Sequence, residues 1–381
     1  MKVLHVLNEI KPSGAETMLR CAAPHWHEHG IECELLATGA SEGEYADALR
    51  DSGYPVHHLP RKRALSYFAA YRAFLRGGGY QVVHQHAESA SYWMGLAAFS
   101  AGAGLVRTVH NNFAFDGNLR WRRALQRRHL QRLGVQHVAI APGVQRNELE
   151  RFGVHSHLIF NWVDVTRFTP ISPAERAQAR ARWAFQDEDL VFITLGNCSR
   201  VKNHGVLIDA LALTTDLAHL KYLHVGLEDD ARSERAQAER LGVANRMQFC
   251  GWMPEAREAL AAADLYVMPS LYEGFSIAAL EALGVGLPAL LARVNGLRDL
   301  DPLFPGLIFS EPECDALASA LRGFAALDPA QRHGLSADYS ERVQTRFSPA
   351  RGVREYVALY KAALQSRTSC VTTVNPTGSP N

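Results

Sequence analysis

Two glutamates, Glu273 and Glu281, are separated by seven residues and follow an apolar run at 265–268. Gly274 permits a tight turn that exposes backbone amides, and Ser276 is a suitable residue to begin a helix. Amides at a helix N-terminus suit a diphosphate, because free N–H groups and the helix dipole both favour negative charge. The carboxylates suit sugar or ribose hydroxyls, which donate hydrogen bonds. On spacing alone, two solvated glutamates on an ordinary loop and helix are an equally good interpretation.

A second candidate is the loop from Gly196 to His204, which follows an apolar run at 190–195. Its cations Arg200 and Lys202 could neutralise a pyrophosphate. The alternative is that both are ordinary solvated cations, and the loop alone does not distinguish the two.

Gly14 and His110 are candidates in the first half of the chain. Gly14 lies in a loop after the first apolar run and lets another group approach the backbone closely. That loop has no GxGxxG pattern, which counts against a dinucleotide-dependent oxidoreductase. His110 follows the run at 105–109, and ligands of open parallel sheets bind beyond the carboxyl ends of the strands. A histidine there can donate to a sugar hydroxyl, and His84 and His86 occupy a similar place with a weaker case.

Apolar runs of strand length alternate with helical stretches along most of the chain. This alternation predicts parallel sheets covered on both faces, and it restarts after a segment near Pro170 to Glu175 that is poor in apolar residues. We therefore predict an α/β protein of two tandem Rossmann-like, doubly wound domains, at 1–168 and 169–348. A final helix is expected at 349–366 and a disordered tail at 367–381. The predicted strands are 3–7, 33–37, 82–84, 105–109, 137–141, 190–195, 221–225, 247–249, 265–268 and 289–291.

The composition sets broad limits on the class of protein. The 381 residues are 47% hydrophobic and 21% charged, which is enough apolar material for two cores. A formal net charge of +1 gives no support for a nucleic-acid binder. Six irregularly spaced cysteines without a CxxC pair predict reduced thiols in a cytoplasmic protein. No apolar run approaches the ~20 residues of a membrane-spanning helix, and the N-terminal run is too short for a signal peptide.

Taken together, these motifs resemble family 4 of the retaining glycosyltransferases, which have the GT-B architecture of two Rossmann-like domains with a cleft between them. The resemblance covers nearly the whole chain, to about Gln365. Its most specific element is the EX7E motif, here Glu273 to Glu281. The basic phosphate motif is similar to Gly196–Lys202, the domain-junction signature to Phe160–Asp164, and the first loop to Ser13–Glu16.

The resemblance implies that the second domain holds a UDP- or GDP-linked sugar and the first holds a saccharide or lipid-linked acceptor. The final helix would cross back to the first domain. Glu281 would bind the ribose, Glu273 the hydroxyls of the transferred sugar, and His110 that sugar near its O6. Lys202, with Arg200, would bind the diphosphate. The residues implied in donor binding are Gly14, Gly196, Asn197, Gly274, Phe275, Ser276, Ile277 and Glu281.

The implied reaction transfers a hexosyl residue with retention, by front-face attack in which the leaving phosphate accepts the proton. It needs no protein base, cofactor or metal, and no group of metal ligands has a suitable spacing in the sequence. Asn197 departs from the family's pattern, because an arginine is common there. Either Arg200 replaces that charge or the donor phosphate is held less strongly. Phe160 and Trp162 replace the usual Pro and Gly near the junction, so the local backbone geometry is expected to differ.

The segment Arg120–Arg132 carries six arginines and no acidic residue. Trp121 and Leu125 are about one helical turn apart, so this helix could lie on anionic headgroups at the inner face of a membrane. That place would suit a lipid-linked acceptor. The alternative is a solvated basic face, packed on its domain by Trp121, Leu125 and Leu130.

We expect a role in cell-surface polysaccharide or glycolipid biosynthesis. A sugar-nucleotide epimerase of the same architecture is disfavoured by the EX7E motif, and a phosphorylase by the lack of a motif for a pyridoxal lysine. A non-catalytic sugar-nucleotide binding module is a further alternative, motivated by Asn197.

Overall fold

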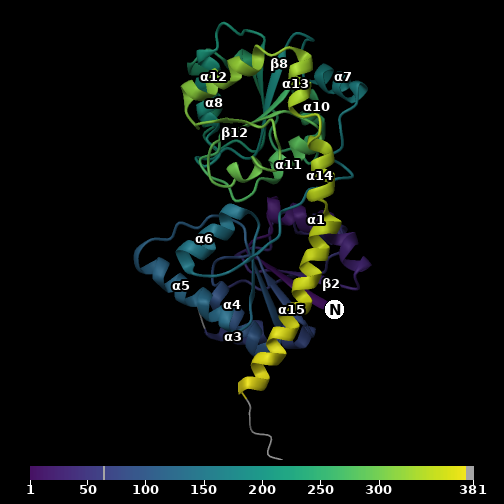
Figure 1. Cartoon of the computed structure of the whole chain (residues 1–381), viewed down its shortest axis with the longest axis vertical. Helices are drawn as coiled ribbons and strands as arrows, with labels where there is room; N and C mark the ends of the chain where they lie inside the picture. The colour runs from purple at the N-terminus through teal and green to yellow at the C-terminus, as the bar shows by residue number, and fades with distance from the viewer. Residues whose placement is uncertain (63–64, 375–381) are drawn as a thin grey trace, which may run out of the picture. The chain divides into compact units, whose positions relative to one another are not determined.

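A computed structural model describes residues 1–62 and 65–374 of the chain (Figure 1). The chain divides into two compact units. Unit 1 comprises Met1–Trp162 and the segment from Pro349 onward, and unit 2 comprises Val163–Ser348. The sequence had placed the boundary slightly later, between residues 168 and 169.

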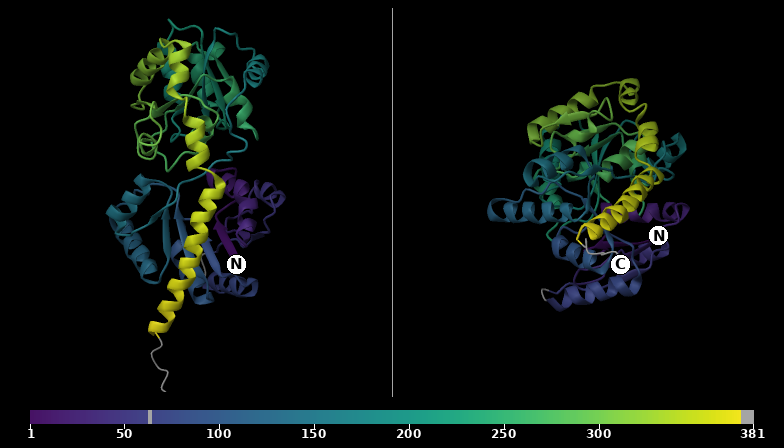
Figure 2. Two further views of the ribbon diagram at one scale, coloured as in Figure 1. Left: turned by 45° about the vertical axis from the view of Figure 1, so that its right-hand side comes forward. Right: turned by 60° about the horizontal axis from the view of Figure 1, so that its bottom comes forward.

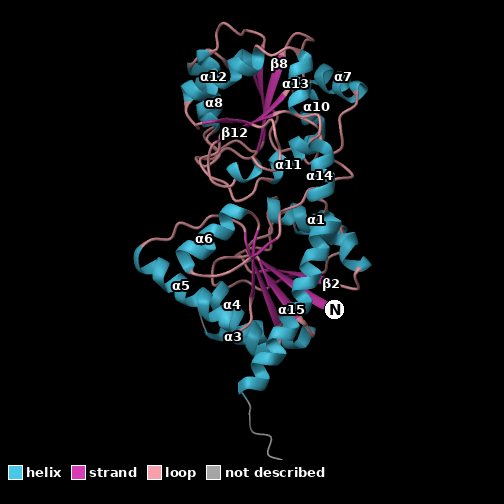
Figure 3. Ribbon diagram, viewed as in Figure 1, coloured by secondary structure: helices cyan, strands magenta, loops and turns pink. Residues whose placement is uncertain are grey.

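Unit 1 contains one seven-stranded sheet in the order β3-β2-β1-β4-β5-β6-β7, and all neighbouring strands are parallel. Helices lie on both faces of this sheet (Figure 3). The strands are β1 (Lys2–Leu7), β2 (Glu32–Ala37), β3 (Val56–His58), β4 (Val82–Gln85), β5 (Gly104–Val109), β6 (Gln136–Ala139) and β7 (His157–Leu158). The helices are α1 (Gly14–Glu28), α2 (Ala46–Asp51), α3 (Leu65–Gly78), α4 (Ser91–Ala101), α5 (Gly117–Arg132), α6 (Pro142–Phe152) and α15 (Pro349–Val374).

Unit 2 contains a six-stranded parallel sheet in the order β10-β9-β8-β11-β12-β13. Its strands are β8 (Leu190–Leu195), β9 (Leu220–Val225), β10 (Met247–Phe249), β11 (Leu265–Met268), β12 (Ala289–Ala292) and β13 (Ile308–Ser310). Its helices are α7 (Pro173–Arg182), α8 (His204–Leu213), α9 (Ser233–Arg240), η1 (Ala244–Arg246), α10 (Ala256–Ala262), α11 (Ile277–Gly284), η2 (Arg298–Leu300), α12 (Cys314–Ala325), α13 (Pro329–Leu335) and α14 (Tyr339–Arg346).

Burial on both faces explains why the strands are nearly continuous apolar runs. All residues of β5, β8, β11 and β12 are buried. Strands covered by helices on both sides have no solvent-facing positions, so the alternation of polar and apolar residues disappears. The predicted class, two tandem doubly wound α/β domains, is therefore confirmed.

Each sheet has a point at which the strand order reverses. In unit 1 the chain runs outward from β1 in one direction and then restarts at β4 on the other side of β1. In unit 2 the same reversal occurs between β8 and β11. The loops after two such strands diverge, which leaves a crevice at the carboxyl ends where ligands of this fold bind.

The long helix α15 returns to unit 1 and lies along its sheet (Figure 2). Trp162 is buried between this helix and α1. Its indole N–H donates to the Met18 carbonyl of α1 at 3.0 Å, and a Cβ atom added at Gly352 of α15 would lie 2.1 Å from the indole ring. Gly352 therefore makes room for Trp162, which stands at the junction where the family usually has a glycine. The helix continues to Val374, past its predicted end at 366, and residues 375–381 of the predicted tail lie outside the described residues.

Within 1–62 and 65–374, no helix is both long and apolar enough to cross a bilayer.

Candidate functional site

The segment after β11 forms the turn and helix start that the sequence predicted. Ser276 precedes α11, and its hydroxyl accepts a hydrogen bond from the Ala279 N–H at 3.1 Å. The loop is supported from the next strand, since the Glu273 N–H donates to the Asn295 carbonyl at 3.2 Å. A Cβ atom at Gly296, where φ is +89°, would lie 2.2 Å from the Glu273 carbonyl oxygen. This support fixes a first helical turn whose N–H groups lack acceptors within the helix.

Lys202 and Glu273 meet across the switch point of unit 2. Lys202 Nζ lies 2.8 Å from Glu273 Oε1, and the side chains are 26% and 15% exposed. The backbone holds the same two loops together, because the Leu271 N–H donates to the Val201 carbonyl at 2.8 Å. Two motifs predicted separately from the sequence thus form one charged site. A partly exposed pair of this kind stabilises the fold by roughly 0–1 kcal/mol, so it can reorganise around a ligand at little cost.

Both glutamates of the EX7E motif act on one buried tyrosine of β11. Burial, followed by the charges of Glu273 and Glu281, raises the pKa of Tyr266 well above its usual value. Glu273 lies in the loop after β11, and Glu281 lies on α11, the helix that follows this loop. Gly274, Phe275, Ser276 and Ile277, also predicted to bind the donor, are buried in the turn between them.

The loop after β8 has two different kinds of residue. Gly196, at φ +144°, lies against the stem of Lys202, and a Cβ there would be 3.3 Å from Lys202 Cε. The side chain of Asn197 accepts a hydrogen bond from the Leu227 N–H at 2.9 Å and so ties this loop to the loop after β9. Arg200 is exposed. Asn197, which stands where the family usually has an arginine, is therefore hydrogen-bonded to the backbone. Arg200 is the cation of this loop that a bound phosphate could recruit.

In unit 1, Gly14 is the first residue of α1, directly after the loop that follows β1. The preceding Ser13 hydroxyl hydrogen-bonds to Glu16, whose side chain is buried. Burial raises the pKa of Glu16. The hydrogen bond between Ser13 and Glu16 thus fixes the first turn of α1, which begins at Gly14.

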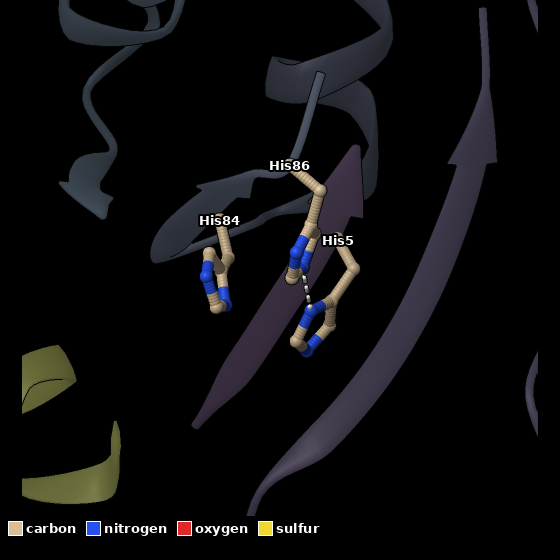
Figure 4. Close-up of side chains that lie close together, drawn as sticks. All are labelled: His5, His84 and His86. Atoms are coloured by element: carbon tan, nitrogen blue, oxygen red, sulfur yellow. Dashed lines mark hydrogen bonds between the residues drawn. The ribbon is translucent and has the colours of Figure 1, made fainter. Parts of the chain in front are cut away.

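A cluster of four histidines lies at the carboxyl ends of β1, β4 and β5, at the switch point of unit 1. The strand register places His5 opposite His84. His5 Nδ1 lies 3.0 Å from His86 Nε2, and His86 Nδ1 lies 3.0 Å from His110 Nε2 (Figure 4 shows the rings of His5, His84 and His86). His84 is held separately, by Thr108 Oγ1 at 2.7 Å and the Tyr360 hydroxyl at 2.8 Å.

These histidines are neutral at pH 7. Burial lowers the pKa of His5 to about 3, and burial followed by the charge of Arg107 lowers that of His110 to about 4. A neutral imidazole carries one N–H, so the chain His5–His86–His110 has two possible proton arrangements. His5 Nε2 is buried, with no hydrogen-bond partner among the described residues.

Buried N–H groups without partners are rarer than unpaired acceptors. The network therefore favours a proton on Nδ1 of His5. His86 then accepts at Nε2 and donates from Nδ1 to His110 Nε2, which leaves the remaining donor of His110 at its Nδ1.

A buried ion network lies next to this cluster and was not predicted. Arg107, on β5, and Arg127, on α5, share the carboxylates of Glu88 and Glu148. Arg127 Nη2 lies 2.8 Å from Glu88 Oε1, and Arg107 Nη1 lies 3.3 Å from Glu148 Oε2. One arginine of the predicted basic helix is thus a core residue. The sequence signal was Arg107 itself, a charge inside an apolar run.

The outer face of α5 is unlike its buried face. Trp121 is 64% exposed and Leu125 67% exposed, and Arg122 and Arg132 are exposed beside them. Of the three residues that the alternative interpretation expected to pack on the domain, Leu130 is buried and the other two are not.

Two family models match consecutive parts of the chain. The model described as Glycosyltransferase Family 4 matches residues 12–167, and the model described as Glycosyl transferases group 1 matches residues 175–338. The chain belongs to the family 4 glycosyltransferases. It is thus an enzyme that transfers a sugar from a nucleotide sugar, and its two Rossmann-like units constitute the GT-B fold.

Individual relatives agree with this assignment. This glycosyltransferase is 26% identical over 313 residues to EpsF of Bacillus subtilis, across 76% of its own chain and 79% of that protein. It is 29% identical over 216 residues to the lipopolysaccharide core biosynthesis glycosyltransferase LpsD of Rhizobium meliloti, across 53% of its chain and 57% of LpsD. Among solved structures, HepE of Anabaena in complex with UDP matches with a TM-score of 0.82 at 20% identity, across 95% of this chain and all of HepE.

Proposed function

We propose that this glycosyltransferase moves a hexosyl residue from a UDP- or GDP-linked sugar to a saccharide or lipid-linked acceptor, with retention of anomeric configuration. The observation that carries the proposal is the Lys202–Glu273 pair beside the N-terminus of α11. The pair supplies a cation for phosphate and a carboxylate for sugar hydroxyls. Both lie at the same end of the sheet as the backbone amides of the first turn of α11.

The leaving group explains why these parts belong together. When the bond from the anomeric carbon to the β-phosphate oxygen breaks, negative charge develops on the phosphate. Lys202 and the amides of the first turn of α11 stabilise that charge, with Arg200 recruited from solvent. Glu273 is released from Lys202 as the diphosphate binds, and its carboxylate then accepts hydrogen bonds from the sugar. Glu281 holds the ribose.

Retention follows if the acceptor hydroxyl attacks from the face that the phosphate leaves. The acceptor oxygen bonds to the anomeric carbon, and its proton passes to the departing phosphate oxygen. The electrons and proton then balance without a base from the protein. His110 contributes a neutral donor to the sugar. This division of roles makes Lys202, rather than a divalent cation, the main source of positive charge.

Relatives support the choice of donor and pathway. HepE was solved with UDP and with UDP-glucose, which favours a uridine nucleotide for this chain. LpsD, named for lipopolysaccharide core biosynthesis, favours a cell-surface glycan as the product. The exposed Trp121 and Leu125, with Arg122 and Arg132 beside them, favour an anionic membrane surface as the place where a lipid-linked acceptor is met.

Calorimetric titration of UDP and GDP, with and without divalent metal, tests the donor site. We expect saturable binding of UDP that does not need added metal, and a loss of at least tenfold in affinity in Glu281→Ala, equal to about 1.4 kcal/mol. The control is Glu239→Ala, an exposed glutamate of α9. Unchanged affinity in Glu281→Ala would refute the assignment of Glu281. Binding of UDP-sugar without turnover on any saccharide or lipid acceptor would favour the non-catalytic module instead.

A further inference from the structure

A second group of metal-ligand side chains lies in unit 2, where Cys198 follows β8, His204 begins α8 and His224 lies in β9. Cys198, His204 and His224 each offer one ligand atom, and these atoms all lie within 4.8 Å of one another. Cys198 Sγ is 3.4 Å from His224 Nε2. Burial, followed by the negative charge of Glu234 on α9, raises the pKa of the Cys198 thiol. His224 is distant from the other two residues in the sequence, so the spacing along the chain gave no sign of a site.

One polar atom of this group has no partner. His204 Nδ1 is buried and without a hydrogen bond in the part of the chain that the structure describes. The His204 side chain is 3% exposed. Leaving a buried polar atom unpaired costs about 1–3 kcal/mol, so an unpaired imidazole nitrogen beside a thiol and a second imidazole calls for a ligand.

The orientation of His224 is the one that a metal ligand needs. Its Nδ1 is 3.0 Å from Thr194 Oγ1, which is itself 2.8 Å from the Tyr222 hydroxyl. This chain fixes the imidazole so that Nε2 faces Cys198. Metal-binding histidines are held in this way by a hydrogen bond at their other nitrogen.

The histidine cluster of unit 1 does not share these features. Both ring nitrogens of His84 and both of His86 have hydrogen-bond partners, and the cluster contains no thiol or carboxylate ligand. A metal ion there would have to displace bonds that already satisfy the rings.

We propose that Cys198, His204 and His224 bind one divalent transition-metal ion, for which Zn²⁺ is the best match. One thiolate and two imidazoles are ligands that Zn²⁺ prefers, and a water molecule would complete a tetrahedral set. Zn–S bonds of ~2.3 Å and Zn–N bonds of ~2.0–2.1 Å place sulfur and nitrogen roughly 3.5 Å apart at a tetrahedral centre. The observed separation of Cys198 Sγ and His224 Nε2 is 3.4 Å.

The ion would act on the loop and not on the sugar. Cys198 and His204 lie on either side of Lys202 in sequence, so an ion held by both fixes the segment that carries the phosphate-binding cation. On binding, the Cys198 thiol loses its proton to solvent and Zn²⁺ takes its place. The proposal depends on the geometry of unit 2 and does not require the donor assignment to be correct.

The test uses the full chain, stripped of metal by a chelator and titrated with Co²⁺ and then Zn²⁺. We expect one Co²⁺ per chain, with the absorption of a tetrahedral ion and a thiolate-to-cobalt charge-transfer band, and displacement of Co²⁺ by one equivalent of Zn²⁺. Cys198→Ser should remove the charge-transfer band and weaken Zn²⁺ binding by at least 10- to 100-fold. Cys250→Ser, another partly buried thiol of unit 2, is the matched control and should change neither.

Two further variants separate loss of the site from loss of the fold. His204→Gln removes an imidazole whose Nδ1 makes no hydrogen bond among the described residues, and it should weaken Zn²⁺ binding while the circular dichroism spectrum is unchanged. His86→Gln, in the cluster of unit 1, should leave the cobalt spectrum as in the wild type. No thiolate band with Co²⁺, or equal Zn²⁺ affinity in the wild type and in Cys198→Ser, would overturn the proposal, whatever the outcome of the UDP titrations.

Discussion

The two switch points have the same strand topology and contain opposite kinds of chemistry. In unit 1 the carboxyl ends of β1, β4 and β5 carry buried or partly buried, neutral imidazoles joined by hydrogen bonds. In unit 2 the loops after β8 and β11 carry a partly exposed ion pair beside a helix N-terminus. The fold therefore supplies a position, and the side chain after each strand decides whether that position suits a neutral or a charged ligand.

The difference follows from solvation. Lys202 and Glu273 keep contact with water, so their ion pair can open around a charged ligand at little cost. His5 is buried and His110 is partly buried, and burial lowers the pKa of both. A neutral imidazole can donate a hydrogen bond to a hydroxyl without attracting an anion.

The largest expected effect is on the charged side. Lys202→Ala should lower kcat/KM by about 100- to 1000-fold, the range for loss of one group that stabilises developing charge. Steady-state kinetics with a UDP-sugar measures it. Lys221→Ala, which removes another lysine of unit 2 that pairs with a carboxylate, should stay within twofold of the wild type. A loss below fivefold in Lys202→Ala would mean that Arg200 and the helix amides carry the phosphate alone.

The second prediction concerns acid stability. His110 titrates near 6.5 in the unfolded chain and at about 4 in the folded one, so the unfolded state binds more protons between these values. Stability contributed by this group is complete above pH 6.5 and falls as the pH drops towards 4, by about 3 kcal/mol at most. Lowered pKa values are also found for His5, His84, His86 and His137 in unit 1 and for His204 and His224 in unit 2.

Unit 1 has more of these histidines, so it should open first as the pH is lowered. Hydrogen exchange on the intact chain at pH 7 and pH 5, corrected for the intrinsic rate, reports each unit separately. Earlier loss of protection in β8 and β9 than in β1 and β4 would contradict the comparison.

The third prediction tests the neutral side. His110→Phe keeps an aromatic ring at this partly buried position and removes the donor, so kcat/KM should fall by about 10- to 100-fold, the equivalent of roughly 1–3 kcal/mol for one hydrogen bond. His27→Phe, at an exposed position of α1, should have no effect. Nitrogen NMR of the wild type should place the His110 proton on Nδ1. A proton on Nε2 would reverse the inferred direction of the His5–His86–His110 chain.

The sequence predicted much of the fold because buried parallel strands produce apolar runs that are easy to recognise. It missed β3, β7 and β13, which have two or three residues each and lie toward the sheet edges. It predicted Lys202 and Glu273 as site residues but could not show that they pair, because contact between loops depends on strand order.

The surroundings of polar residues inside strands and helices were harder to predict from the sequence. His5 looked like part of an apolar strand, and only the register with β4 reveals that it faces His84. Arg127 looked like a surface cation because its neighbours in α5 are arginines. Its burial depends on Glu88 and Glu148, which come from other elements. Long-range pairing of this kind leaves no pattern in the local sequence.

The smallest expected effect concerns the outer face of α5, where unit 1 offers adjacent aromatic, aliphatic and cationic groups to an anionic surface. Trp121→Ser should lower partitioning onto vesicles of anionic phospholipid by about fivefold, since only part of the ~1.5–3 kcal/mol of full apolar burial is gained at an interface. The exposed Trp252 of unit 2 provides the control, and Trp252→Ser should leave partitioning unchanged. Because arginines supply the long-range attraction, binding should also weaken as salt is raised. Equal losses in both variants would show that the two units do not differ in affinity for lipid, and the asymmetry would then be confined to the switch points.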